Sequence, residues 1–198
     1  MTTPHPSLAA VILAGGGGVR LGGVEKASIE IHGQTLLEHA LAGTAAADEV
    51  VVVGPELPTS RPVTWTRESP PGGGPAAGML AGLGALAVRP ELVCVLAVDM
   101  PRFSAATLDR LVDVLMSAGD EADGACLVDR AHHKQWLAAV YRYDALTRAR
   151  PADRATEHGL SIRRLMMPLR ILGVPATAHE ARDVDTWADL RDLRELDD

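Results

Sequence analysis

The sequence predicts an α/β protein: a single domain built on a twisted, mostly parallel β-sheet with helices on both faces. Two observations lead to this prediction. Apolar residues make up 47% of the 198-residue chain but aromatic residues only 3%, so aliphatic side chains must form the core. Short apolar runs, typical of buried parallel strands, alternate with stretches of helical periodicity. No internal repeat or long linker divides the sequence.

Four elements are expected in the first third of the chain. Leu8–Leu13 has the short apolar pattern of a buried strand and runs into glycines. A helix is expected within residues 34–47, where apolar side chains recur on one helical face. Glu49–Val53 is a second strand, and a weaker third lies around Trp65. This order predicts a β-loop-α-β arrangement.

The next elements flank the most apolar strand of the chain. A helix is predicted from about Pro75, because proline is favoured in the first helical turn. Residues 91–98 form the clearest strand and end in the turn DMP. The following helix starts after Ser104, a residue type that caps helix N-termini, and stops at Gly119.

The rest of the chain is less regular but continues the alternation. Its expected elements are, in order, a strand at 125–128, a turn, a strand at 136–142, a short helix near Ala145, a helix at 161–166, a strand at 170–174 and a terminal helix capped by Asp185 or Thr186. His132 and His133 fall in the turn; adjacent histidines point to opposite sides, so we interpret them as solvated rather than as a metal pair.

Charge and hydropathy exclude several classes of protein. The formal net charge is −7, whereas proteins that coat nucleic acid or anionic membranes need clustered Lys and Arg. The longest apolar run, Leu92–Val98, is far shorter than the roughly 20 residues that span a bilayer. The first residues lack the basic start and cleavage site of a signal peptide. We therefore expect a cytoplasmic protein with Cys94 and Cys126 buried and reduced.

A glycine-rich segment follows the first strand. Val11–Ala27 holds six glycines and two cations, Arg20 and Lys26. It contains neither GxxxxGK[ST] nor GxGxxG, and a nominal GxGxxA at residues 72–77 is interrupted by proline. Glycines cost conformational entropy on folding, which favours a loop that a ligand approaches closely. Its N–H groups and two cations suit phosphate; the alternative is a flexible turn with solvated cations.

Asp99 follows the most apolar strand. In open parallel sheets ligands bind beyond the carboxyl ends of the strands, so this carboxylate is expected at the binding edge. One carboxylate oxygen with phosphate oxygens would suit Mg²⁺. The alternative is a turn or helix-capping aspartate.

These segments together resemble one family, the molybdenum cofactor guanylyltransferases of the MobA type, within the nucleotidyltransferases of Rossmann-like fold. The resemblance rests on LAGGGGVRLGGVEKA against the family pattern LAGGxxxRxGGxDK, GGGPAAGM against a GPLAG loop, VDMP against a DxP turn, and DVDTWADL against NxNTPEDL. The four motifs occur in the family's order and span nearly the whole chain. Residues 1–198 would then form one domain, with a nucleotide-binding half to about residue 120 and an acceptor-binding half from about 121.

The resemblance implies transfer of GMP from GTP to the terminal phosphate of molybdopterin, with release of pyrophosphate and with Mg²⁺ as cofactor. The implied catalytic residues are Arg20, Lys26 and Asp99, with Asp99 as the metal ligand. The implied nucleotide-binding residues are Leu13, Ala14, Gly15, Gly16, Lys26, Glu68, Gly74 and Asp99. The implied acceptor-binding residues are Gln135, Asp183 and Asp185.

The chain departs from the family pattern at several positions. Glu25 replaces an aspartate, Gly54 an asparagine, Trp136 and Trp187 prolines, and Asp183 and Asp185 asparagines; Glu68 stands near a family aspartate. The changes at Asp183 and Asp185 put acidic side chains where the acceptor or a metal should lie. Asp185 is either a second metal ligand or the cap of the last helix, and Trp136 either stacks on the pterin or packs in the core.

Three alternatives remain open. The twin glycines Gly15-Gly16 favour guanine, since family members that transfer cytidylyl groups more often carry LAAG. The chain could nevertheless be a cytidylyltransferase for molybdopterin, or a guanylyltransferase for another phosphorylated small molecule. It could also be a non-catalytic nucleotide-binding scaffold for cofactor insertion. Molybdoenzyme-maturation proteins are candidate partners; nucleic acid and membranes are not.

Overall fold

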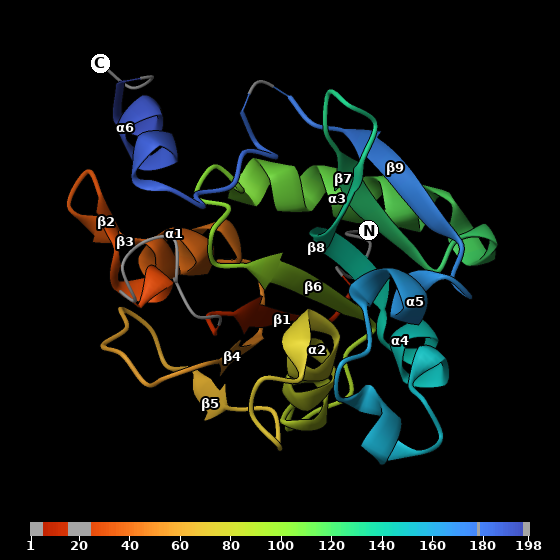
Figure 1. Cartoon of the computed structure of the whole chain (residues 1–198). Helices are drawn as coiled ribbons and strands as arrows, with labels where there is room; N and C mark the ends of the chain where they lie inside the picture. The colour runs from red at the N-terminus through yellow and green to blue at the C-terminus, as the bar shows by residue number, and fades with distance from the viewer. Residues whose placement is uncertain (1–5, 16–24, 178, 196–198) are drawn as a thin grey trace.

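In the computed structural model, which describes residues 6–15, 25–177 and 179–195, one seven-stranded sheet runs through the whole molecule (Figure 1). Its strand order is β5-β4-β1-β6-β8-β7-β9. The strands are β1 (Leu8–Leu13), β4 (Glu49–Val53), β5 (Thr64–Thr66), β6 (Leu92–Ala97), β7 (Gly124–Val128), β8 (Lys134–Arg142) and β9 (Ile171–Pro175). Only β8 runs antiparallel to its neighbours β6 and β7. The predicted α/β class with a mostly parallel sheet is confirmed.

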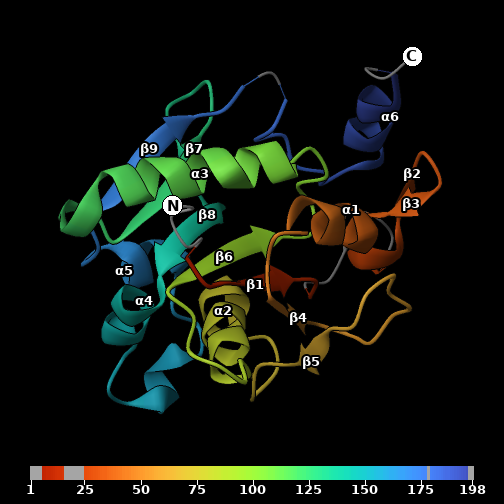
Figure 2. The ribbon, with the colours of Figure 1, turned by 180° about the vertical axis from the view of Figure 1, so that it is seen from behind.

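Helices cover both faces of this sheet, as the two opposite views show (Figures 1 and 2). The helices are α1 (Leu36–Gly43), α2 (Gly74–Gly84), α3 (Ala105–Ser117), α4 (Tyr143–Ala149), α5 (Ile162–Met166) and α6 (Trp187–Glu195). α2, α4 and α5 pack on one face, and α1 and α3 on the other. Short pieces complete the chain: a hairpin of β2 (Glu30–Ile31) and β3 (Gln34–Thr35), and the 3-10 turns Lys26–Ser28, Gly119–Glu121 and Arg154–Glu157.

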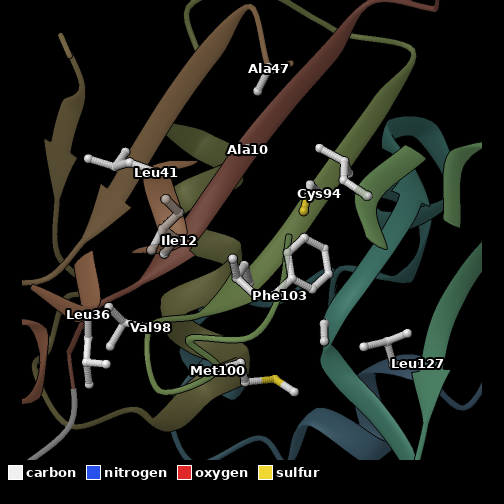
Figure 3. Packing of buried hydrophobic residues seen from close by; sticks show 14 of the residues in the cluster. Ala10, Ile12, Leu36, Leu41, Ala47, Cys94, Val98, Met100, Phe103 and Leu127 are labelled. Carbon is white, nitrogen blue, oxygen red and sulfur yellow. The ribbon is translucent and has the colours of Figure 1, made fainter. Parts of the chain in front are cut away.

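The strand side chains divide between the two faces because successive residues point to opposite sides of a sheet. In β1, Ala10 and Ile12 join the core under α1 and α3, whereas Val11 and Leu13 join the core under α2. Figure 3 shows the first of these cores, to which Ile12, Leu41, Cys94 and Phe103 belong. Both cores are aliphatic apart from few aromatic rings, as the composition predicts.

The first helix, α1, lies within the predicted range, residues 34–47. It begins only after Thr35, whose hydroxyl oxygen accepts a hydrogen bond from the backbone of Glu38 at 3.2 Å. The helix ends at Gly43, and turns follow. The cause at the start is competition, because the two residues before the helix pair with β2 instead.

Cys94 and Cys126 are buried and free, as predicted. Burial raises the pKa of the Cys94 thiol to about 12 and that of Cys126 to about 11, so neither is a thiolate near neutral pH. Among the described residues, no helix combines the length and the apolar character needed to cross a membrane.

Candidate active site

A cavity of about 470 Å³ opens at the edge where the parallel strands β1, β4 and β6 end. Its lining includes six residues that the sequence predicts to bind nucleotide: Leu13, Gly15, Lys26, Glu68, Gly74 and Asp99. Ala14 is buried between two of them. Gly16 and Arg20 lie outside the described residues, so their predicted roles stay predictions.

The floor of the cavity is held by the sheet itself. Backbone pairing continues past the end of β1, where the N–H of Ala14 donates to the Val53 carbonyl at 2.9 Å. Gly54 follows β4, and a Cβ at this position would lie 2.9 Å from the carbonyl carbon of Ala14. This contact gives a physical reason for glycine where the family pattern has asparagine, because a side chain would collide with the floor.

The loop before α2 forms a second wall. Gly74 has φ +85°, a conformation that favours glycine, and Pro75 follows at the start of the helix. The N-terminus of this eleven-residue helix lines the cavity. The first N–H groups of a helix have no partner within the helix and commonly bind phosphate. Glu68 supports the loop, since its carboxylate accepts a hydrogen bond from the N–H of Gly72 at 3.2 Å.

Lys26 lies between two carboxylates at the cavity. Its Nζ donates to Asp99 Oδ2 at 3.1 Å and to Asp185 Oδ1 at 2.6 Å. The lysine side chain is 16% exposed, against 26% for Asp99 and 45% for Asp185. Burial works to lower the pKa of Lys26, but the hydrogen bonds and charges of the two aspartates outweigh it and raise that pKa. The ammonium is therefore charged at neutral pH.

The last helix is capped by Thr186. The hydroxyl oxygen of Thr186 accepts a hydrogen bond from the Asp189 N–H at 3.2 Å, and Asp189 Oδ2 accepts one from the Thr186 N–H at 2.7 Å. Of the two caps that the sequence allowed, Thr186 thus makes the reciprocal bonds, while the carboxylate of Asp185 binds Lys26. The preceding residue fixes this geometry, because the N–H of Val184 donates to the Asp99 carbonyl at 2.9 Å.

Asp183 joins the same group of acids. Removal of its carboxyl group from water by surrounding atoms, together with the negative charges of Asp185 and Asp99, raises the pKa of Asp183. Within residues 6–15, 25–177 and 179–195, no set of three His, Cys, Asp or Glu side chains is arranged to hold a metal ion by itself.

Gln135, the remaining predicted acceptor residue, does not line the cavity; Leu137, two residues further along β8, does. The side-chain amide of Gln135 donates to Asp129 Oδ2 at 3.1 Å. The other carboxylate oxygen, Asp129 Oδ1, accepts from the N–H groups of Ala131 and His133. Gln135 therefore supports the turn between β7 and β8. His133 is exposed in this turn, as predicted.

Trp136 packs against the apolar core under α2 rather than standing free, although it is only partly buried. Of the two roles considered for it, core packing is the one that its contacts support.

The sequence did not single out Val53, Gly78 or Leu137 as lining residues. From the sequence alone, an apolar residue at a strand end or inside a helix looks the same whether it lines a cavity or packs in the core.

The fold and this cavity define a general class, the α/β proteins that bind a ligand beyond the carboxyl ends of parallel strands. The family model described as "MobA-like NTP transferase domain" matches residues 10–170, which is most of the chain. The chain therefore belongs to the family of MobA-like NTP transferases.

Two relatives illustrate the similarity in sequence. A molybdenum cofactor guanylyltransferase of Acidiphilium cryptum is 38% identical over 161 residues, which cover 75% of this chain and 76% of the relative. A probable molybdenum cofactor guanylyltransferase of Mycobacterium marinum is 35% identical over 164 residues, with 78% of each chain covered.

Solved structures show the same fold at lower identity. The molybdopterin-guanine dinucleotide biosynthesis protein A of Archaeoglobus fulgidus superposes with a TM-score of 0.71 at 21% identity, covering 95% of this chain and 97% of its own. The 2-C-methyl-D-erythritol 4-phosphate cytidylyltransferase of Thermus thermophilus reaches 0.65 at 19% identity, with 96% and 98% covered. The Rossmann-like architecture is therefore confirmed, and it is shared by proteins named for different nucleotides.

Proposed function

We propose that the protein transfers GMP from GTP to the phosphate of molybdopterin, releasing pyrophosphate and forming the molybdopterin guanine dinucleotide cofactor. The observation that carries this proposal is the position of Lys26, charged and held by Asp99 and Asp185 at a glycine-lined cavity. The names of the relatives support the choice of nucleotide and acceptor.

The nucleotide would lie against backbone rather than against side chains. Gly15 and Gly74 leave room for it on two walls, and the N-terminus of α2 offers N–H groups to its phosphates. The ammonium of Lys26 would stabilise the negative charge that develops as pyrophosphate leaves. Arg20 and Gly16 are proposed for the same phosphates on the sequence pattern alone.

The donor atoms present fit a magnesium ion. Asp99 and Asp185 lie close enough together to share one ammonium group, and both offer the hard carboxylate oxygens that Mg²⁺ prefers. Mg²⁺ typically takes one or two carboxylates and completes its shell with phosphate and water. We propose these two residues as its protein ligands; the ion would supply charge that lowers the cost of bringing two phosphates together.

The acceptor would approach from the side of residues 183–185. Asp185 binds Lys26 and Asp183 lies among the neighbouring acids, so both can contact a group that enters next to the nucleotide phosphates. Gln135 would not contact the acceptor directly. It would hold the turn between β7 and β8 in place through its hydrogen bond to Asp129. No covalent intermediate with the protein is needed, because the acceptor phosphate can attack the nucleotide directly.

Release of pyrophosphate in the presence of Mg²⁺ and molybdopterin tests this function, with GTP and CTP compared in the same assay. Release with GTP alone is the expected result. Release with CTP alone would replace it by the cytidylyl reaction. If neither nucleotide gives pyrophosphate release although nucleotide binds, the result would favour another phosphorylated acceptor or the non-catalytic scaffold.

The variant Asp99→Asn separates an enzyme from a scaffold. An enzyme should lose turnover by about 10²–10³-fold in this variant while it retains part of its nucleotide binding. If the protein is a scaffold, Asp99→Asn should behave like the parent protein in every assay.

The proposed cytoplasmic location is tested by cell fractionation. The proposed partnership with molybdoenzyme-maturation proteins is tested by co-purification.

A further inference from the structure

A second cavity lies beside the nucleotide cavity, and the proposed function does not use it. Its volume is about 460 Å³, within the usual range for small-molecule sites. It lies between α2 and the segment that joins α4 to α5, two elements on the same face of the sheet (Figure 1). Glu68 lines both cavities.

The walls of this second cavity differ in chemistry. Ala77, Leu80 and Ala81 of α2 give an apolar wall. Arg67, Arg154 and His158 line the cavity as well. Arg154 is exposed, and among the described residues its side chain has no hydrogen-bonding or charged partner. These walls suit a molecule that combines an apolar body with an anionic group.

Two other arginines of the cavity make hydrogen bonds, and only one of them is bound to a carboxylate. Arg150 binds the carboxylate of Glu157 through two hydrogen bonds of 2.7 and 3.2 Å. Arg67 donates through Nε to the Gly54 carbonyl at 3.3 Å, which holds its guanidinium group beside the cavity. Because Arg150 is neutralised, Arg67 and Arg154 are the cations that a bound anion would meet.

The surrounding segment is basic although the protein is acidic. Residues 142–170 contain seven arginines and three acidic residues, in a chain of net charge −7. Arg142, Arg148 and Arg170 pair with Glu91 or Asp123 outside this segment. Among the described residues, Arg154, Arg163 and Arg164 have no carboxylate partner and supply the local excess of positive charge. Such a local excess raises the concentration of anions near the cavity. It is a second observation, independent of the cavity, that points to an anionic ligand.

The cavity is joined to the nucleotide loop by direct contacts. The N–H of Gly159 donates to the Gly73 carbonyl at 2.9 Å. Gly73 is packed so closely that a Cβ there would lie 2.7 Å from the Cβ of Ala77 and 3.2 Å from Nδ1 of His158. Gly73 precedes Gly74, which lines the nucleotide cavity. A ligand beside His158 would therefore touch the support of that loop.

We propose that the second cavity binds a phosphorylated small molecule with an apolar body. Its phosphate lies on Arg67 and Arg154, and its apolar part lies on Leu80 and Ala81. Its binding is coupled to nucleotide binding through residues 72–74. The coupling rests on the proposed function, whereas binding to the cavity does not.

Titration of ¹⁵N-labelled protein with phenyl phosphate, followed by two-dimensional NMR, tests the site. Saturable shifts are expected at the amides of Gly84, Ala85 and Ala155, which line this cavity alone, and phenol without phosphate should not produce them. In Arg154→Ala the affinity should fall by about tenfold, because a hydrogen bond between charged groups is lost.

Arg163→Ala is the matched control, because it removes an exposed arginine of the same basic segment that does not line the cavity. It should bind phenyl phosphate as the parent does. Equal weakening in both variants would mean attraction by general charge and would overturn the site. Shifts confined to Gly15, Gly74 and Asp99 would mean binding in the nucleotide cavity and would overturn it too.

The coupling is measured in the pyrophosphate assay. Saturating phenyl phosphate should change the KM for GTP by about fivefold or more in the parent, and the concentration that gives half of this change should be about tenfold higher in Arg154→Ala. An unchanged KM in the parent, or the same half-maximal concentration in both proteins, would overturn the coupling. If no nucleotide gives turnover, the proposed function fails while the NMR result on the cavity still stands.

Discussion

The two sides of Lys26 are built in different ways. On the nucleotide side, Asp99 follows directly from a buried parallel strand, and the sheet fixes the cavity floor. On the proposed acceptor side, Asp183 and Asp185 lie in the connection between β9 and α6; its described residues, 176–177 and 179–186, are called the strap. Polar contacts hold the strap, together with the buried side chain of Val184. A change on the first side should therefore disturb the core, whereas a change on the second should disturb acceptor contacts selectively.

Glu180 is the main anchor of the strap. Its carboxylate accepts hydrogen bonds from Arg110 at 3.1 and 2.6 Å, from the Thr107 hydroxyl at 2.7 Å and from the Thr177 N–H at 2.7 Å. Burial works to raise the pKa of Glu180, but these bonds outweigh it and lower that pKa to about 2. The strap is thus attached to α3 through one charged group.

The largest effect is expected where the two sides meet, at Lys26. Lys26→Met removes the ammonium that binds the carboxylates of both Asp99 and Asp185. We expect kcat to fall by about 10²–10³-fold, the usual cost of losing one group that stabilises transition-state charge. Pyrophosphate release measures this effect. Lys134→Met is the control, since that lysine binds the Ile171 carbonyl elsewhere on the sheet; equal losses in both variants would contradict the role of Lys26.

Glu180→Gln should release the strap and leave the nucleotide side intact. We expect the free energy of unfolding to fall by about 1.5–3 kcal/mol, the range for hydrogen bonds to charged groups. Arg110 increases the effect, because its Nε is already buried without a partner among the described residues. The KM for the acceptor should rise while the affinity for GTP stays at the parental value. A rise in the KM for GTP alone would contradict the division into two sides.

The same contact predicts a pH dependence. Because the pKa of Glu180 is about 2 when folded and near 4.5 when unfolded, its contribution to stability is fully present above about pH 4.5. It is lost as the pH falls from about 4.5 towards 2. Chemical unfolding of the parent and of Glu180→Gln should therefore differ at neutral pH and converge near pH 2. A difference that does not shrink with falling pH would disprove the assignment.

The sequence predicted that Lys26 and Asp99 lie at one edge of the sheet, but it placed Gln135 at the same site, which the structure does not. Strand periodicity located the ends of β1 and β6, and the rule that ligands bind there brought Lys26 and Asp99 together before the structure did. The sequence of the strap shows no strand or helix periodicity that would locate its residues. Whether Asp185 or Thr186 caps α6 depends on which side chain meets Lys26, a contact across 159 residues that local chemistry does not encode.

Gly82→Ala tests how far the nucleotide side depends on the core. A Cβ on Gly82 would lie 2.3 Å from Cγ1 of Val11 and 3.0 Å from Cγ2 of Val53, so α2 must move away from β1 and β4. We expect a loss of about 1–3 kcal/mol in the free energy of unfolding, typical of overpacking, and weaker nucleotide binding. Gly84→Ala, where the nearest atom is 3.9 Å away, is the control and should not destabilise the protein.

Thr186→Ala should have the smallest effect of the four substitutions and the most local one. It removes the hydroxyl that caps α6, and such a loss typically costs about 1 kcal/mol. Thermal unfolding should show this cost, which Thr35→Ala, the cap of α1, should match. The two caps should differ in function, because Thr186 adjoins Asp185, whereas Thr35 caps a helix that does not follow the strap. Only Thr186→Ala should raise the KM for the acceptor; equal KM values in the two variants would show that the strap holds Asp185 without help from α6.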